Sequence, residues 1–249
     1  MTRTPFGPTP FGRTSFRRTS FVLNAVLSLA LQTAFAYQPG QFYSQGHPKE
    51  KIIALTFDDG PGAITPQVLD FLKEHHARAT FFILGDQVAL YPQNLRMIRA
   101  AGHELGNHTY YHLDYHKVKD HPADKLAKEL DLTEQAMQKA LGDPQFKTKI
   151  LRMPYGAYGK FNKSWLIPLL KERGYALVHW SFGTDWLLKM TPEQMADAYI
   201  KNAFPGAVFL MHDGGRHREK TFSALKIVIP ALEQKGYRFV AAEDMFKDE

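Results

Sequence analysis

Short apolar runs alternate with amphipathic stretches along most of the chain. The run Ile52–Phe57 is typical of a buried strand, whereas residues 65–76 carry Val68, Leu69 and Leu72 on one side and predict a helix. The same alternation continues to the end of the sequence. It predicts further strands at 80–84, 103–106, 150–153, 176–180, 207–211 and 237–240, and further helices at 92–101, 123–141, 162–173, 191–202 and 218–235.

Turn and cap residues mark several of these boundaries. Thr65 and Thr191 stand where a helix N-cap is expected, and each is followed by a proline at the first helical position. Gly142 ends the helix predicted at 123–141. Pro230 lies inside the last predicted helix, so we expect a kink or a break there.

Alternating strands and helices predict an α/β fold with a parallel sheet and helices outside it. About seven such units favour a single barrel domain at 51–249 over an open sheet, and the polar stretch 37–50 is predicted to be a linker or an N-terminal arm. Active sites of such barrels lie at the C-terminal ends of the strands. The polar residues at these ends are Asp58, Asp59, His108, Arg152, Tyr155, Asp185 and His212.

The first 36 residues differ from the rest. Arg17 and Arg18 precede an interrupted apolar run that ends in Ala34-Phe35-Ala36, the small-x-small pattern of a signal-peptidase site. We interpret residues 1–36 as a secretory signal and expect export to the periplasm or the extracellular space, with no stable membrane span after cleavage at Ala36. An uncleaved amphipathic anchor is the alternative, and both general and twin-arginine export stay open.

Charge and cysteine content limit the predicted binding partners and the residue types that could bind a metal. The chain has 31 Lys and Arg against 25 Asp and Glu, but four of the arginines lie in the acid-free stretch 1–36, so the remainder is nearly balanced. It has no dense basic stripe, and nucleic acid is not a predicted partner. There is no cysteine, so a transition metal would have to be bound by histidine and carboxylate.

Two adjacent carboxylates end the first predicted strand. Asp58 and Asp59 precede the turn residues Gly60, Pro61 and Gly62. Neighbouring strand residues point to opposite faces, so one carboxylate can bind a metal while the other transfers protons. A plain surface turn is the alternative, because Asp-Gly-Pro is common in turns.

His108 and His112 are four residues apart. On a helical turn both imidazoles would face the same side, which is a metal-binding spacing. With one aspartate they would give two histidines and a carboxylate, a set that suits zinc and also cobalt or iron.

Five short segments resemble the motifs of the polysaccharide deacetylases, which are carbohydrate esterase family 4 and carry the NodB homology domain. They stand in the family's order and span most of the chain after residue 36. The segments are Thr-Phe-Asp-Asp-Gly-Pro at 56–61, His-Thr-x-x-His at 108–112, Arg-Met-Pro-Tyr at 152–155, Asp-Trp at 185–186 and Leu-Met-His at 210–212. The resemblance implies a distorted (β/α) barrel with fewer than eight full units.

The resemblance also implies a division of roles within the site. It makes Asp59, His108 and His112 the ligands of a divalent metal, with zinc expected first and cobalt or another divalent ion as alternatives. It makes Asp58 the general base and His212 the general acid.

Supporting roles follow from the same resemblance. Arg152 would orient the base, and Asp185 would orient and charge the general acid. The backbone N–H of Tyr155 would help to stabilise the oxyanion. Leu210 and Trp186 would line the pocket for the acetyl methyl group.

These roles fit the chemistry of amide hydrolysis. The acetamide carbonyl is a poor electrophile, and a metal would polarise it and acidify the attacking water. Asp58 would take the proton of that water. His212 must be cationic to protonate the leaving nitrogen, and a buried Asp185 would favour the cation.

One position departs from the family pattern. The fourth motif often has a second aspartate three residues before Asp185, but Phe182 stands there and is followed by Gly183. We expect this pair to reshape one wall of the cleft and to affect the choice of substrate more than the mechanism.

We therefore expect an exported, metal-dependent hydrolase of non-peptide carbon–nitrogen bonds that removes N-acetyl groups from a polysaccharide. Peptidoglycan is the first expected substrate, and chitin-type oligomers are the second. The alternatives are an O-acetyl esterase acting on acetylxylan, a cyclic amide or ureide hydrolase, and a non-catalytic carbohydrate-binding module. The intact Asp59, His108 and His112 set argues against the cyclic amide hydrolase, and the intact Asp58 and His212 argue against the binding module.

Overall fold

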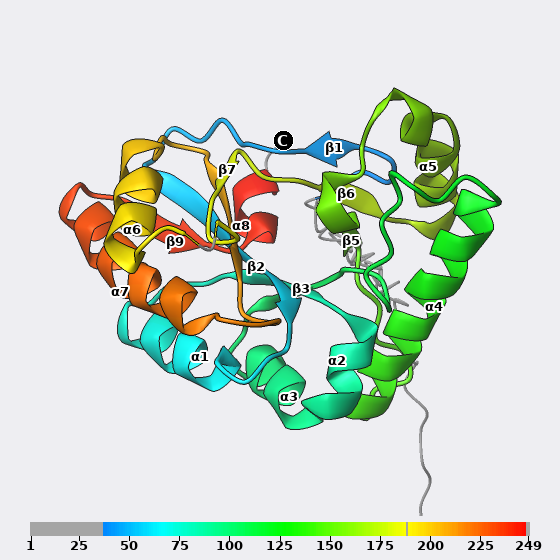
Figure 1. Ribbon diagram of the computed structural model, residues 1–249, viewed down its shortest axis with the longest axis horizontal. Coiled ribbons are helices and arrows are strands. Elements are labelled where there is room, and N and C mark those ends of the chain that lie inside the picture. Colours follow the sequence, from blue (N-terminus) through cyan, green and yellow to red (C-terminus); the bar gives the residue numbers. More distant parts are fainter. Residues whose placement is uncertain (1–36, 188, 248–249) are drawn as a thin grey trace, which may run out of the picture. The chain divides into compact units, whose positions relative to one another are not determined.

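The computed structural model describes residues 37–187 and 189–247, so the signal predicted at 1–36 lies outside the described residues. Strands and helices alternate, as the sequence predicts (Figure 1). The strands are β1 (Phe42–Tyr43), β2 (Ile52–Gly60), β3 (Thr80–Ile83), β4 (Glu104–Asn107), β5 (Ile150–Leu151), β6 (Ala176–Val178), β7 (Phe182–Gly183), β8 (Val208–His212) and β9 (Arg238–Val240). The helices are α1 (Thr65–Glu74), α2 (Gly85–Leu90), α3 (Pro92–Ala100), α4 (Pro122–Leu141), α5 (Lys160–Arg173), α6 (Pro192–Lys201), α7 (Glu219–Gln234) and α8 (Ala242–Phe246), with a 3₁₀ turn at Pro154–Gly156.

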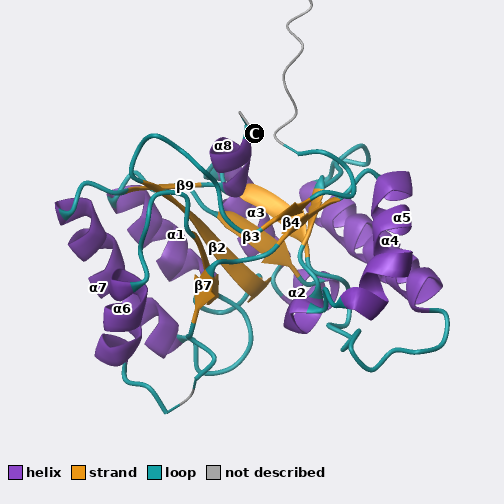
Figure 2. Ribbon diagram, turned by 90° about the horizontal axis from the view of Figure 1, so that it is seen from above, coloured by secondary structure: helices purple, strands orange, loops and turns teal. Residues whose placement is uncertain are grey.

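The named strands form one sheet whose pairs are all parallel. The order is β1-β6-β5-β4-β3-β2-β8-β7, and β9 pairs with the first half of β2. The longer helices lie outside the strands (Figures 1 and 2). The predicted single-domain, distorted (β/α) barrel is confirmed.

The stretch 37–50 packs as an arm across the opening of the barrel (Figure 1). Its strand β1 pairs with β6, and Gln45 then forms an antiparallel bridge with Ala207, just before β8. At its start, Tyr37 is buried, and its hydroxyl donates to Glu104 Oε1 at 2.7 Å. The stretch is thus attached to the sheet at β6 and next to β8.

Alternation along β2 fixes which side chains reach the interior of the barrel. Ile53, Leu55 and Phe57 pack in the main hydrophobic cluster, together with residues of α1 and α7. Thr56 and Asp58 fall on the other face of the pleat, toward the interior. The strand therefore delivers a carboxylate to the inside of the sheet at its C-terminal end.

The predicted long elements are present, with ends that differ by a few residues. Thr191 caps α6 through a capping box, as expected. Thr65, by contrast, is the first helical residue of α1, and its hydroxyl accepts the N–H of Gly62 and donates to Asp213. The helix α7 continues through Pro230 without a break.

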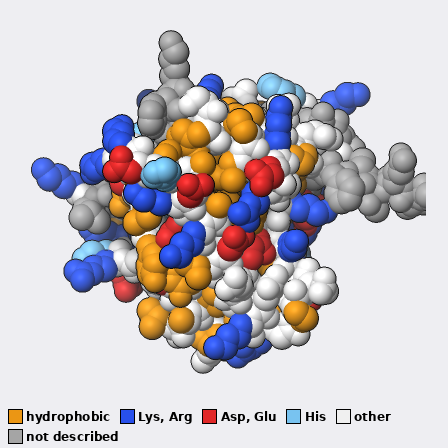
Figure 3. All heavy atoms as spheres, turned by 90° about the vertical axis from the view of Figure 1, so that its right-hand side faces the viewer, with side chains coloured by type: hydrophobic (Ala, Val, Ile, Leu, Met, Phe, Trp, Pro, Cys, Tyr) orange, Lys and Arg blue, Asp and Glu red, His pale blue; other side chains and the backbone are white. Residues whose placement is uncertain are grey.

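Two surface features bear on the predicted partners. No helix within the described ranges is both long and apolar enough to cross a bilayer. On the face formed by α4 and α5, basic and acidic side chains are interspersed (Figure 3).

Candidate functional site

A cleft of about 540 Å³ lies at the C-terminal ends of the strands. Arg152 and Asp185 are buried behind it and contact residues that line it. The structure thus brings all ten predicted site residues together at one end of the sheet. The eight that line the cleft are Asp58, Asp59, His108, His112, Tyr155, Trp186, Leu210 and His212.

Asp59, His108 and His112 form a cluster that could hold a metal ion, with ligand atoms within 4.8 Å of one another. Asp59 Oδ1 lies 3.5 Å from His108 Nε2 and 3.4 Å from His112 Nε2. This oxygen is buried and has no hydrogen-bond partner among the described residues, as expected for an atom that would bind a cation. His108 Nδ1 lies 2.7 Å from the carbonyl oxygen of Arg152, so it donates there and leaves Nε2 to face Asp59.

Unusual backbone conformations place these ligands. Asp59 has a φ of 67°, which turns its side chain away from the direction that β2 would give it. Thr109 and His112 have φ values of 69° and 56°, so the segment 108–112 is an irregular loop after β4. The helical turn that we predicted for the two histidines is therefore wrong, although both imidazoles do reach the same aspartate.

The charges of the cluster favour a ligand role. Burial by itself would raise the pKa of Asp59, but its electrostatic interaction with His108, with smaller contributions from His212 and His112, holds the pKa well below its usual value. Burial lowers the pKa of His112 to about 4. An ionised carboxylate and neutral imidazoles are the forms that bind a metal.

Asp58 is held by a fully buried arginine. Arg152 Nη1 donates to Asp58 Oδ1 and to Thr56 Oγ1, both at 2.7 Å. Its Nε and Nη2 donate to the backbone carbonyls of residues 178–179. A lysine has no planar fork of donors and could not make this set of bonds. The other oxygen of Asp58 lies 3.6 Å from His108 Nε2, so the carboxylate is fixed by one oxygen and faces the metal-binding cluster with the other.

His212 is paired with Asp185 through its ring Nδ1. Burial alone would lower the pKa of His212, but the charge and hydrogen bond of Asp185 outweigh burial and raise it. The imidazole is therefore biased toward the cation at the edge of the cleft.

Aromatic and apolar groups form the rest of the walls. Tyr155 has a φ of 56° in the 3₁₀ turn, and its exposed ring lies 4.6 Å from the ring of His112. Trp186 is half-exposed, with its ring 6.0 Å from that of His212. Leu210 is buried against the same wall. This apolar corner has the character needed for a small methyl group.

Phe182, which stands where the family often has an aspartate, is next to Gly183, and only Gly183 contacts the cleft wall at Trp186. Phe182 packs edge-on against Tyr199 and Phe209, on the core side of β7, and does not line the cleft. Gly183 lies under Trp186, where a Cβ would come within 2.9 Å of the indole ring. Of the pair that we expect to reshape this wall, Gly183 is the member that contacts it, and its missing side chain lets the indole pack close.

Arg218 is a cleft residue that the sequence analysis missed. Its guanidinium lies 3.7 Å from Asp59 Oδ2 and 3.8 Å from Asp185 Oδ2, and its Nε donates to the carbonyl of Gly214. It adds a positive charge between the metal-binding cluster and the partner of His212. The only signal was its place in a glycine-rich stretch six residues after His212.

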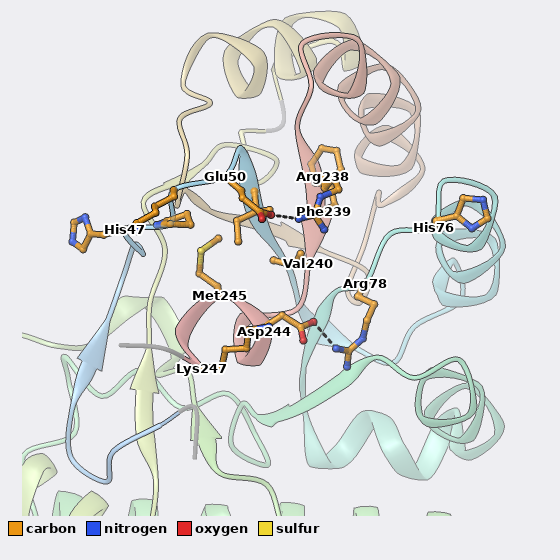
Figure 4. Close-up of a pocket in the computed structure, with 13 residues that line it drawn as sticks. His47, Glu50, His76, Arg78, Arg238, Phe239, Val240, Asp244, Met245 and Lys247 are labelled. Carbon is orange, nitrogen blue, oxygen red and sulfur yellow. Dashed lines mark hydrogen bonds and ion pairs between the residues drawn. The ribbon is translucent and has the colours of Figure 1, made fainter. Parts of the chain in front are cut away.

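A larger groove, of about 780 Å³, lies at the opposite end of the strands (Figure 4). Its two arginines are paired with carboxylates: Arg78 contacts Glu243 and Asp244, and Arg238 contacts Glu50. None of the ten predicted site residues lines it. The groove therefore has no part in the chemistry considered for the cleft.

Comparisons with known proteins identify the family of the chain. The profile of the polysaccharide deacetylase family matches residues 45–178. A peptidoglycan-N-acetylglucosamine deacetylase of Bacillus cereus is 35% identical over 219 residues, which are 86% of this chain and 76% of the relative. A chitooligosaccharide deacetylase of a Bradyrhizobium species is 34% identical over 198 residues, which are 74% of this chain and 86% of the relative.

A solved structure of a deacetylase is also similar to this chain. The crystal structure of the Bc1960 peptidoglycan N-acetylglucosamine deacetylase superposes with a TM-score of 0.73 and 33% sequence identity, and the match covers 86% of this chain and 94% of that one. The chain belongs to the polysaccharide deacetylase family. The predicted family and the predicted enzyme class, a hydrolase of non-peptide carbon–nitrogen bonds, are confirmed.

Proposed function

We propose that the protein is an exported, metal-dependent deacetylase that hydrolyses the N-acetyl groups of a polysaccharide. The observation that carries this proposal is the cluster of Asp59, His108 and His112, which lies in the same cleft as Asp58 and His212. A bound divalent ion would supply Lewis-acid polarisation of the acetyl carbonyl and would lower the pKa of the attacking water. Zinc is the first choice, because it accepts two imidazoles and a carboxylate and leaves a position open.

The protein's own residues would carry the proton transfers. Asp58, which is held by a hydrogen bond from Arg152, would accept a proton from the attacking water as the new carbon–oxygen bond forms. The backbone N–H of Tyr155 would donate to the oxyanion of the tetrahedral intermediate. His212 would then give its proton to the leaving nitrogen as the carbon–nitrogen bond breaks, releasing acetate and a free amine. Asp185 would stabilise the His212 cation before that step.

The cleft walls would select the acyl group. Trp186 and Leu210 give an apolar corner beside His212, which suits a methyl group and disfavours a charged one. Family relatives that act on peptidoglycan and on chitooligosaccharide support a glycan with N-acetyl groups. We place peptidoglycan first because the predicted signal at 1–36 would deliver the enzyme to the cell wall.

Acetate release tests this function. Protein stripped of metal by a chelator would be assayed on peptidoglycan, chitin oligomers and acetylxylan, before and after the addition of zinc or cobalt. We expect metal-restored release from peptidoglycan or chitin oligomers. Release from acetylxylan alone would make the protein an O-acetyl esterase, and glycan binding without any release would make it a binding module.

A further inference from the structure

The two histidines of the metal-binding cluster flank a loop that regular secondary structure does not hold. Thr109, Tyr110 and Tyr111 separate His108 from His112, and the loop contains two residues with positive φ. A loop of this kind has many alternative conformations in which the two imidazoles would not face one aspartate. Its backbone must therefore be fixed by groups elsewhere in the fold.

A buried glutamate on α4 fixes two of the loop's amides. Glu129 is only 5% exposed, and its Oε2 accepts the backbone N–H of Tyr110 at 2.9 Å and that of Tyr111 at 2.7 Å. Both bonds go to the same carboxylate oxygen, so a single buried side chain holds two consecutive amides of the loop. The bond from Thr133 Oγ1 to the carbonyl of Glu129 adds a further contact within the helix.

Other groups hold the remaining backbone of the loop. The N–H of Thr109 donates to Asn107 Oδ1 at 2.9 Å. From the start of α2, the N–H groups of Gly85 and Asp86 donate to the carbonyls of Thr109 and Tyr110. The loop is thus held by α2 through its carbonyls and by α4 through its amides, and α2 and α4 pack against each other (Figure 1).

We propose that Glu129 is a positioning residue for the metal site, which sets metal affinity through the backbone of the His108–His112 loop. Its two bonds are to backbone amides between the histidines, so it acts without touching metal or substrate. The inference rests on the proposed function for the metal itself. Residues that orient metal ligands from behind typically change metal affinity by about 10–100-fold when they are altered.

The test compares three substitutions at this position. Glu129→Ala removes the acceptor, Glu129→Asp keeps the charge but draws the oxygen back by one methylene, and Glu129→Gln keeps an acceptor oxygen at the same reach. We expect the dissociation constant for Zn²⁺, measured by chelator competition, to rise about 10–100-fold in Glu129→Ala. Glu129→Asp should show a rise of about 10-fold, and Glu129→Gln should stay within about 3-fold of the parent.

A matched control lies on the same helix. Glu134 is a partly buried carboxylate of α4, and its Oε1 accepts from Thr148 and Tyr175. It bonds to no group of the loop itself and reaches it only through Tyr175 and Asn107. Glu134→Ala should lower the thermal unfolding temperature of the metal-free protein but leave the Zn²⁺ dissociation constant unchanged. An effect of Glu129 that is merely structural would resemble this control.

Separate readouts distinguish the possible failures. If Glu129→Asp binds Zn²⁺ as tightly as the parent, the positioning role is refuted, whether or not Glu129→Ala folds. If the parent binds Zn²⁺ but releases no acetate, the proposed function fails, while the comparison of dissociation constants still decides the role of Glu129. For an active parent, excess Zn²⁺ should restore most acetate release in Glu129→Asp.

Discussion

Asp185 contacts His212 at two points. Its Oδ1 lies 2.8 Å from the ring Nδ1, and its Oδ2 accepts the backbone N–H of His212 at 2.9 Å. Thr221 donates to that second oxygen at 2.8 Å. The pair therefore fixes both the orientation of the imidazole and the nitrogen that carries the proton, and it leaves Nε2 as the ring nitrogen available to the cleft.

Substitution of Asp185 should change the pH dependence of the reaction. The charge of Asp185 raises the pKa of His212, so Asp185→Asn should lower it. Because the general acid must be protonated, the falling basic limb of kcat/KM should move to lower pH, and the rate at the optimum should fall by about 10²–10⁴-fold. Thr221→Val keeps the carboxylate and should leave the limb near its original place. A basic limb that does not move in Asp185→Asn would remove His212 from the role of acid.

A second histidine should control the stability of the fold in acid. His103 is buried, and its Nδ1 accepts the N–H of Ala79. Burial, with a smaller effect from the charge of Arg78, lowers its pKa to about 4. The unfolded chain protonates this ring near pH 6.5, so its contribution is complete above that value and is lost as the pH falls toward 4. The loss between pH 7 and pH 5 should be about 2 kcal/mol.

Denaturant unfolding at the two pH values measures this contribution. In His103→Gln, the free energy of unfolding should fall by about 2 kcal/mol less between pH 7 and pH 5 than it does in the parent. His76 is exposed, so in His76→Asn the free energy of unfolding should depend on pH as it does in the parent. An unchanged pH dependence in His103→Gln would show that the ring is not held neutral.

Much of this fold could be predicted from the sequence, because its long elements carry strong periodicity. The run Ile52–Phe57 and the helix that ends at Gly142 lie close to where the pattern placed them. The strands β1 and β7 have two residues each, and α2 and α8 have six and five, which is too short for a periodic signal. These elements depend on their partners in space.

The site shows the same division. Asp58 and His212 can be predicted from the sequence because each stands at the end of an apolar run. Arg218 and Glu129 cannot be predicted in this way, because their roles come from contacts with residues that are distant in sequence. The spacing of His108 and His112 predicts a helical turn that the backbone does not adopt, and the positive φ values that bring both rings to Asp59 leave no periodic signal in the sequence.

Close packing behind the metal-binding cluster gives another prediction. A Cβ on Gly214 would come within 1.8 Å of the carbonyl oxygen of Asp59, and backbone cannot yield as a flexible side chain can. Gly214→Ala should therefore displace Asp59, weaken Zn²⁺ binding and lower the free energy of unfolding by about 1–3 kcal/mol. Gly159→Ala, where a Cβ would meet open space, is the control. Unchanged Zn²⁺ affinity in Gly214→Ala would show that the aspartate is not placed by this contact.

The position of Tyr37 bears on processing. The ring of this residue is buried, and its hydroxyl donates to Glu104. Cleavage after Ala36 would make Tyr37 the first residue of the exported protein. N-terminal sequencing of the exported protein should therefore start at Tyr37. A different first residue, or an intact leader in the membrane fraction, would contradict cleavage there.

The two adjacent aspartates should respond differently to the same substitution. Asp58 is bonded to Arg152, whereas Asp59 faces the two histidines. Asp58→Asn nearly keeps the shape but cannot accept a proton, so the rate should fall by about 10²–10⁴-fold while metal content stays near that of the parent. Asp59→Asn should weaken metal binding, because a neutral amide oxygen is a poorer ligand than a carboxylate.

Rescue by metal separates the two roles. Excess Zn²⁺ should partly restore acetate release in Asp59→Asn and should leave Asp58→Asn inactive. His112→Ala removes a ligand and should lose bound metal and activity together. Metal occupancy and rate would be measured for all three variants against metal concentration. A metal-free Asp58→Asn beside a metal-replete but inactive Asp59→Asn would reverse the assignment, since the carboxylate that binds the metal would then be the one that Arg152 holds.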